Sequence, residues 1–391
     1  MVDWNAFFEG IKLILNWELM ALSLLGVGFG TILGLIPGLS ATIGIALMLP
    51  MSYYMDPLPV MVLMLGIYTG GMYGGSITSI LINAPGTPGA ACTAFDGYPL
   101  NKQGKGLLAL LLALISSVIG GFIGIVCLFF FLNVLGIVVL KLGPPEMFMI
   151  TFLALALIST VRPESIGKTF LAGCTGIIMA NIGVSATGLA VGSFGQVYLL
   201  EGIPFVPALI ALFAFPEFFY LIEKEYITEV DITQVLGQNA MKELGRALKT
   251  VVKYPLTLIK SAIIGVFIGM MPAAGASVAS VLAYGEARRT SKNPELFGKG
   301  AEEGVIAAEA ANNASEGGSL LTAIVLGIPG SAATAMIIAA LALQGISAGP
   351  KMILEYKDMV YGVIAMEFVQ VLMLFFVGLA VILFCYRVVA I

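Results

Sequence analysis

One stretch of the sequence concentrates acids and amides directly before an apolar run. Between positions 301 and 319 it carries Glu302, Glu303, Glu309, Asn312, Asn313 and Glu316. The last four are three, one and three positions apart, so they share one face of a helix. Ionisable residues inside a membrane are costly and tend to be functional. We therefore predict that Glu309, Asn313 and Glu316 bind a sodium ion or carry a proton, whereas Glu302 and Glu303 begin the helix in solvent.

Two motifs rich in glycine and proline interrupt apolar stretches. The first, Asn83 to Gly89, follows Gly74 to Ser76, and the second, Gly327 to Ser331, follows Gly317 to Ser319 in the same order. Irregular backbone at membrane depth is tolerated only where it is buried in protein or lines a watery cavity. A broken helix presents free N–H groups and a positive dipole end, which suits an anion. The alternative is that these small residues only let helices pack closely.

Two further motifs predict re-entrant hairpins. Gly34 to Ser40 and Gly269 to Gly275 each place a proline between glycines in the middle of an apolar stretch. Proline cannot donate a backbone hydrogen bond and glycine loosens a helix, so each motif is interpreted as a hairpin tip. The stretch 255–284 has basic loops at both ends and should enter and leave the membrane on one side. A hairpin within 19–50 would open toward the opposite side.

The tips and breaks together supply the predicted binding residues for a small organic anion. They are Pro37, Gly38, Ser40, Ser76, Asn83, Gly86, Thr87, Asn312, Asn313, Ser319, Gly330 and Ser331. Lys and Arg are nearly absent from the apolar segments, so helix dipoles, amides and a co-bound cation would hold the anion. This pattern favours cation-coupled uptake over a simple anion pore.

The composition is that of a membrane protein. Of 391 residues, 59% are hydrophobic and 11% are charged, whereas a soluble domain carries about 25% charged residues. Apolar stretches predict about ten membrane-embedded segments, some of them broken or re-entrant. They lie near 19–50, 58–84, 107–140, 145–160, 166–182, 204–222, 255–284, 303–328, 330–346 and 359–386. We predict an all-α polytopic membrane protein.

The order of tip and break repeats along the chain, which predicts an inverted repeat, a common plan of secondary transporters. Chance similarity of glycine-rich membrane sequence is the alternative. The predicted units are a first membrane half (1–222), a cytoplasmic polar linker (223–253) and a second membrane half (254–391). Lys and Arg gather around 102–105, 224–253 and 288–299, which predicts that these loops are cytoplasmic. The loops 51–59 and 181–204 should be extracytoplasmic.

Several functions are disfavoured by what the sequence lacks. It contains no histidine, its four cysteines form no CxxC pair, and no GxxxxGK[ST] phosphate loop is present. We therefore expect no enzymatic activity, no cofactor, no metal site and no nucleic-acid partner. An intramembrane enzyme is a weak alternative, and a passive anion channel or a structural membrane subunit is a second one. Asp96, before Gly97, is interpreted as a helix cap or turn residue or as a substrate contact.

Long motifs of this chain closely resemble the large membrane subunit of tripartite tricarboxylate transporters. They are Gly34 to Gly38, Tyr73 to Leu100 (YGGSITSILINAPGTPGAACTAFDGYPL), Gly202 to Phe205 with Phe213, Ala214 and Glu217, and Gly304 to Gly330 (GVIAAEAANNASEGGSLLTAIVLGIPG). The likeness runs over nearly the whole chain. The signature regions of the family fall on Pro37 to Thr42, Gly74 to Gly89 and Asn312 to Ser331, which are the tips and breaks.

The resemblance implies uptake of tricarboxylates or other small organic carboxylates, driven by a Na⁺ or H⁺ gradient. It implies two protein partners, a small membrane subunit and an extracytoplasmic solute-binding protein that delivers the substrate, and a place in the lipid bilayer of the bacterial cytoplasmic (inner) membrane. Relatives continue beyond the length of this chain, so the resemblance implies either a C-terminally truncated fragment or a shortened variant. The loop 186–196 lacks the charged residues expected in relatives.

Overall fold

The computed structural model describes residues 4–139, 166–185, 189–204 and 240–388, with isolated residues between 141 and 219. The predicted segments at 145–160 and 204–222 lie largely outside the described residues. So do the first part of the central linker, up to residue 239, and the motif residues Phe213, Ala214 and Glu217.

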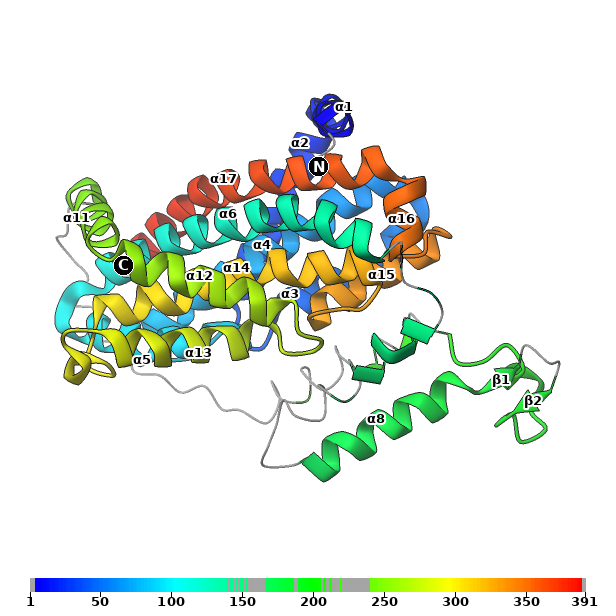
Figure 1. Cartoon of the computed structure of the whole chain (residues 1–391). Helices are drawn as coiled ribbons and strands as arrows, with labels where there is room; N and C mark the ends of the chain where they lie inside the picture. Colours follow the sequence, from blue (N-terminus) through cyan, green and yellow to red (C-terminus); the bar gives the residue numbers. More distant parts are fainter. Residues whose placement is uncertain are drawn as a thin grey trace.

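The described part of the chain is almost entirely helical (Figure 1). Its N-terminal elements are α1 (Trp4–Ile14), α2 (Trp17–Leu35), α3 (Ala41–Met48), η1 (Leu49–Tyr54), α4 (Pro57–Ile82), η2 (Pro88–Ala90), α5 (Ala91–Leu100), η3 (Asn101–Lys105) and α6 (Gly106–Val139). A peripheral segment follows with α8 (Ile166–Ala180), η5 (Val197–Leu199) and two short antiparallel strands, β1 (Gly183–Val184) and β2 (Ala190–Val191). The remaining elements are α11 (Ala240–Lys253), α12 (Pro255–Gly269), α13 (Gly275–Thr290), η8 (Pro294–Leu296), α14 (Glu302–Leu326), α15 (Ala332–Leu343), α16 (Pro350–Glu355) and α17 (Lys357–Val388).

Four helical stretches in the described residues are long and apolar enough to cross a membrane. They are Trp17–Leu35, Pro57–Ile82, Pro88–Val139 and Lys357–Cys385, and the pair α11 and α12, bent by 77°, adds a fifth if it is one span. The prediction of an all-α polytopic membrane protein is therefore confirmed. Helix α14 is buried along nearly its whole length, from Gly304 to Val325, and lies inside the bundle between α6 and α12 (Figure 1).

Both predicted tips are bends between helices. The first, between α2 and α3, reaches φ 87° at Gly38, and the second, between α12 and α13, reaches φ 58° at Ala273. Each bend is closed by a backbone hydrogen bond, from Leu39 N to Ile36 O (2.9 Å) and from Ala274 N to Met271 O (3.2 Å). The two tips therefore share one backbone design. Glycine suits the first position because it adopts positive φ without steric cost.

Both predicted breaks also share one design. Helix α4 ends at Asn83 with φ 56°, and α14 ends at Gly327 with φ 71°, both left-handed helix caps. The next backbone N–H, of Ala84 in one case and Ile328 in the other, then bonds to the carbonyl of a threonine six residues earlier, at 3.3 and 3.4 Å. The chain leaves each helix through a proline and a glycine and re-enters a helical turn.

The helices that carry the two breaks run in opposite directions. Thr69 on α4 contacts Glu316 on α14, while Ser76, further along α4, contacts Glu309, which is earlier on α14. Within each unit, by contrast, the long arm of the hairpin runs parallel to the broken helix. Gly26 of α2 lies against the backbone of Leu63, and Gly34, further along α2, lies against that of Gly71, further along α4. The glycines of α12 contact α14 in the same parallel order. The two hairpins therefore open toward opposite ends of the bundle.

Backbones approach closely where glycines line these helix pairs. A Cβ atom at Gly26 would lie 2.6 Å from the carbonyl oxygen of Leu63, which real Cβ atoms essentially never do. Glycines 30, 34, 70 and 74 are equally enclosed in the α2–α4 pair, and Gly120 and Gly124 of α6 are enclosed against α14. Small residues that let helix backbones meet are typical of packing inside membranes.

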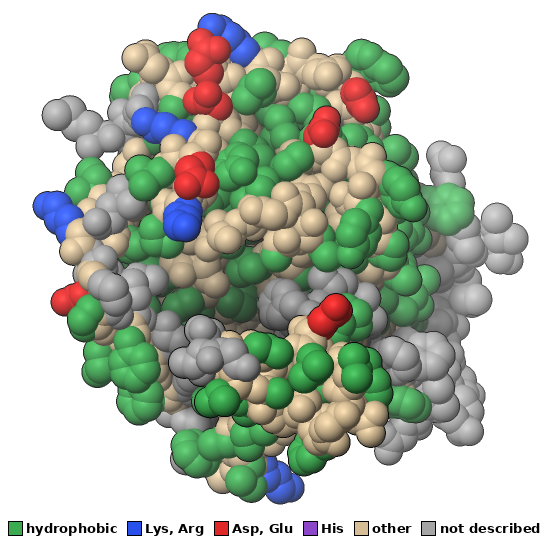
Figure 2. Space-filling view, turned by 90° about the vertical axis from the view of Figure 1, so that its right-hand side faces the viewer, with side chains coloured by type: hydrophobic (Ala, Val, Ile, Leu, Met, Phe, Trp, Pro, Cys, Tyr) green, Lys and Arg blue, Asp and Glu red, His purple; other side chains and the backbone are tan. Residues whose placement is uncertain are grey.

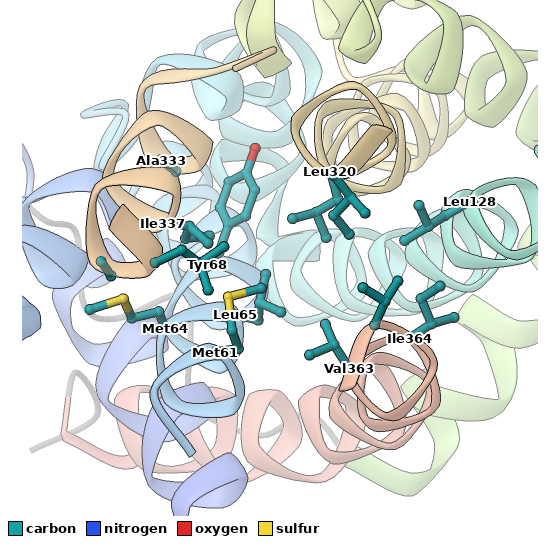
Figure 3. Packing of buried hydrophobic residues seen from close by; sticks show 14 of the residues in the cluster. Met61, Met64, Leu65, Tyr68, Leu128, Leu320, Ala333, Ile337, Val363 and Ile364 are labelled. Atoms are coloured by element: carbon teal, nitrogen blue, oxygen red, sulfur yellow. The ribbon is translucent and has the colours of Figure 1, made fainter. Parts of the chain in front are cut away.

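A large apolar cluster fills the bundle toward one end (Figure 3). Met61 and Leu65 of α4 face Leu320 of α14, and Ile337 of α15 and Ile364 of α17 close the cluster (Figure 3). At that end of the molecule, Figure 2 shows a few scattered charged side chains among many hydrophobic ones. The basic loops around 102–105 and 288–299 meet at the other end. There the side chain of Gln103 in η3 donates a hydrogen bond to the carbonyl of Lys299 at 2.8 Å.

Candidate functional site

Glu309 is a fully buried carboxylate that joins four helices. From α14 it accepts hydrogen bonds from Ser76 of α4 (2.6 Å), Ser117 of α6 (2.7 Å) and Thr93 of α5. Both oxygens of this carboxyl group therefore have hydrogen-bond partners. Ser76, predicted to bind the substrate, and Glu309, predicted to couple ions, are thus in direct contact, and both roles stay predictions.

The two adjacent asparagines behave differently from Glu309. Both are fully buried, yet neither polar atom of the Asn313 carboxamide has a hydrogen-bond partner, and the Oδ1 atom of Asn312 has none. The Nδ2 atom of Asn312 donates to the carbonyl of Met72 at 3.2 Å. A buried polar group without a partner loses the free energy of its hydration, at about 1–3 kcal/mol each. Such groups in native proteins call for an explanation, and an absent ligand is one.

The first break lies against the first tip and reaches the second unit. Gly86 is enclosed by the carbonyl of Gly34, at the end of α2, and by the backbone of Gly75 in α4. Next to it, the Oγ1 atom of Thr87 is buried without a partner. Gly89 then lies against Asn312 and Ala276, so this break connects its own hairpin with α13 and α14 of the other unit.

The second break repeats this arrangement. Gly330 is enclosed by the carbonyl of Gly269, at the end of α12, and by Ser319 of α14, whose hydroxyl also bonds to that carbonyl at 3.1 Å. Ser331 caps α15 in a reciprocal pair with Thr334. Its hydroxyl lies 2.9 Å from that of Tyr68 on α4, which points between α14 and α15 in Figure 3. Each break thus contacts its own tip and the opposite unit.

Three predicted binding residues have other surroundings. Ser40 is the N-cap residue of α3 but makes no capping hydrogen bond, and Pro37 lies half-buried in the tip. Asn83 is exposed and ends α4 through its backbone conformation. These residues shape the tip and the break, and contact of their side chains with a ligand stays a prediction.

The prediction from the sequence did not include Glu367, which lies beside the predicted Glu316. The hydroxyl of Thr69 on α4 bonds to Glu316 of α14 at 2.9 Å and lies 3.5 Å from Glu367 of α17. Both carboxyls are buried, and Oε1 of Glu367 has no partner. The only signal for Glu367 in the sequence is that it is the one acid in the apolar run 359–386.

Asp96 lies inside α5 and at no helix end or turn, so its local interpretation was wrong, and its side chain caps a distant loop instead. Its Oδ1 atom accepts hydrogen bonds from the backbone N–H groups of Gly298, Gly300 and Ala301, at 2.8 to 2.9 Å. It thus ties α5 to the loop that precedes α14. Of the two acids predicted to lie in solvent, Glu303 is in fact half-buried and accepts hydrogen bonds from hydroxyl groups of two neighbouring elements, at 2.6 and 2.7 Å.

A cavity of about 400 Å³ opens beside this loop at the basic end of the bundle. It is lined by Lys105, Lys253, Lys299 and Glu303, among others. The buried polar site of the asparagines is separate from it. Within the residues that the structure describes, no group of three or more His, Cys, Asp or Glu side chains is arranged to hold a metal ion.

Comparison with known proteins gives the chain its family. Residues 20–391 match the tripartite tricarboxylate transporter TctA family. A protein of Agrobacterium vitis, described as an uncharacterized 52.8 kDa protein in the TAR-I ttuC' 3'region, is 35% identical over 358 residues, which are 91% of this chain and 70% of that protein. A second protein of that organism, described as an uncharacterized protein in the TAR-II ttuC' 3'region, is 38% identical over 118 residues, which are 30% of this chain and 49% of that protein. No solved structure matches. The chain therefore belongs to the TctA family of tripartite tricarboxylate transporters.

Proposed function

We propose that this chain is the membrane subunit that carries small organic carboxylates, tricarboxylates among them, across the bacterial cytoplasmic membrane, driven by an ion gradient. An extracytoplasmic solute-binding protein would deliver the substrate, and a small membrane subunit would complete the transporter. Membership in the tripartite family supports the general assignment to transport. The substrate, its coupling and its partners are the proposed part.

The unpartnered atoms of two buried amides carry this proposal, namely Oδ1 of Asn312 and both polar atoms of Asn313. Asn312 lies against Gly89 of the first break, where the hydroxyl of Thr87 is also buried without a partner. Asn313 faces Gly121 of α6. An amide N–H or hydroxyl can donate to a carboxylate, and the amide oxygens can bind a cation that accompanies it. Groups that form hydrogen bonds only when the ligand is bound contribute the free energy of those bonds to its binding.

The paired tips and breaks support an alternating-access mechanism. The two units share one backbone design, and their equivalent helices α4 and α14 run antiparallel. We infer that they form an inverted repeat, in which transporters hold the substrate near the middle of the membrane where broken helices meet. The substrate would be exposed to one side and then to the other as one part of the protein moves.

Uptake into vesicles tests the proposal against the passive channel. Vesicles that contain this chain and its small partner would receive labelled di- and tricarboxylates with a sodium gradient, a proton gradient or neither, with and without the binding protein. Accumulation above equilibrium that needs both a gradient and the binding protein is expected. Equilibration without a gradient would favour a channel, and absence of uptake beside an active relative would contradict the proposal.

The first variant to measure is Asn313→Leu. Because neither polar atom of this side chain has a partner, its replacement should leave the thermal stability unchanged or raise it. Uptake should nevertheless be lost. Asn133→Leu is a matched control, since the Asn133 amide bonds to Phe129 O (3.2 Å) and accepts from Tyr361 at 2.6 Å, so this change should lower stability. Full uptake by Asn313→Leu would exclude it from the site.

A further inference from the structure

The pair of carboxyls on α14 and α17 takes no part in the substrate site just described. Glu316 and Glu367 converge on the hydroxyl of Thr69, at 2.9 and 3.5 Å. They are 2% and 0% exposed. Among the described residues, the ion pairs of Lys and Arg involve other acids, so no cation neutralises this pair.

The hydrogen bonds and charges at this position favour a proton on one of the carboxyls. A hydroxyl has one hydrogen, and the shorter contact, to Glu316, uses it. At 3.5 Å the contact with Glu367 is at best a weak share of that hydrogen, and it is stronger if Glu367 donates a hydrogen of its own. Two carboxylates that share a buried site also cannot both ionise without a large electrostatic cost. One proton held between Glu316 and Glu367 satisfies both conditions.

Unpartnered polar groups nearby indicate that this proton exchanges with water and is not held permanently as part of the fold. The Oε1 atom of Glu367 has no partner although it is buried. One turn away on α17, Oε1 of Gln370 is also unpartnered, and the unpartnered Asn313 lies one turn before Glu316 on α14. Tyr68 is the other titratable residue at this position, and its hydroxyl contacts Ser331. A proton held for structure alone would leave fewer of these groups unsatisfied.

We propose that Glu316 and Glu367, bridged by Thr69, bind the proton that couples transport in this protein. The inference rests on the proposed function and names its coupling ion and the residues that hold it. The pair would bind a proton from water on one side and release it to water on the other. Its net charge would change by one unit each time, with no other reactant. Glu309, whose two oxygens already accept hydrogen bonds from three hydroxyl groups, would join the helices as a brace without taking part in proton exchange.

Transport by the Glu367→Gln variant is the main test. Glutamine keeps the size of the side chain and imitates the protonated acid, but it cannot release a proton. Accumulation driven by a pH gradient should fall by about tenfold or more, within the range usual for coupling between sites. Exchange of labelled for unlabelled carboxylate, which needs no gradient, should persist. Glu303→Gln, a half-buried acid at the start of the same helix as Glu316, is the matched control and should behave as wild type.

Two results would overturn the inference. One is accumulation by Glu367→Gln equal to that of wild type under a pH gradient. The other is wild-type accumulation that follows a sodium gradient and ignores pH. If the proposed function itself fails, exchange is absent from wild type as well, so the two failures are distinguishable.

A spectroscopic measurement decides the matter even if the variants fold poorly or transport cannot be reconstituted. Infrared spectra of the wild-type protein near neutral pH should show the C=O stretch of a protonated carboxylic acid, which shifts in deuterium oxide. Thr69→Val should displace this band and its pH dependence, whereas Thr69→Ser, which keeps the hydroxyl, should restore them. Absence of a protonated acid from the wild-type spectrum would refute the proposal.

Discussion

Replacing Glu309 with alanine should be among the most destabilising single changes in this protein. The substitution removes one acceptor group that three hydroxyls on three other helices share. Each buried hydroxyl left without a partner costs about 1–3 kcal/mol. Serine and threonine in helices can partly recover by bonding to a carbonyl one turn back, so the lower end applies. The expected loss is therefore roughly 3 kcal/mol, to which the cavity adds.

A milder variant separates hydrogen bonding from cavity formation. Glu309→Gln keeps the volume and one acceptor oxygen but turns the other position into an N–H donor. If the amide nitrogen takes the place of Oε2, it faces the hydroxyl of Ser117, and about 1–2 kcal/mol is lost. Removing that hydroxyl with Ser117→Ala should then cost less in the Glu309→Gln background than in wild type. A coupling of about 1 kcal/mol between the two positions is expected, as for residues in direct contact.

Thermal unfolding of purified protein, followed by size-exclusion chromatography after heating, ranks these variants without any need for transport. Wild type should be the most stable, Glu309→Gln less stable and Glu309→Ala the least stable. A melting temperature for Glu309→Ala equal to that of wild type would refute the brace described for this carboxylate. So would additive effects of Glu309→Gln and Ser117→Ala, because independent residues show no coupling.

Two further predictions concern the backbone around the site. Gly86→Ala should abolish folded protein, because its Cβ would collide with the carbonyl of Gly34. Gly28→Ala is the control and should express normally, because a Cβ there meets nothing within 4 Å. Equal yields of the two folded proteins would contradict this packing. Asp96→Ala removes the acceptor of three backbone N–H groups and should speed amide hydrogen exchange at 298–301, while Asp96→Asn, which keeps an oxygen, should change it little. Unchanged exchange in Asp96→Ala would show that the cap is dispensable.

Much of the fold could be predicted because its signals are local. Proline and glycine within an apolar run indicate where a helix must bend or end, and the positions of both tips and both breaks are confirmed. Apolar length alone indicated the spans around α2, α4, α6 and α17. The segments at 145–160 and 204–222 lie outside the described residues, so the expected total of membrane segments stays a prediction.

The partners of each side chain could not be predicted in the same way. Spacing on one helix placed Glu309 and Glu316 on a common face, but it says nothing of which helices pack there. The structure gives Glu309 three hydroxyl partners and Glu316 a second carboxyl, so two residues with equal sequence signals have different surroundings. Glu367 was missed because a single acid in an apolar run has no neighbour in sequence to mark it.

The two kinds of helix contact in this bundle respond differently to their surroundings. Glycine contacts hold α2 against α4 and α6 against α14, and they depend on close packing of the backbones, which a change of protonation does not alter. Between α4 and α14, however, Glu316 and Glu309 meet Thr69 and Ser76 through hydrogen bonds of carboxyls. Under the proposed proton binding by Glu316 and Glu367, the change would act on the contact of α14 with α4 and leave the glycine contacts as they are. In mechanical terms, the glycine contacts would be permanent fastenings, and the carboxyl contact would be a joint that the proposed proton binding loosens or tightens.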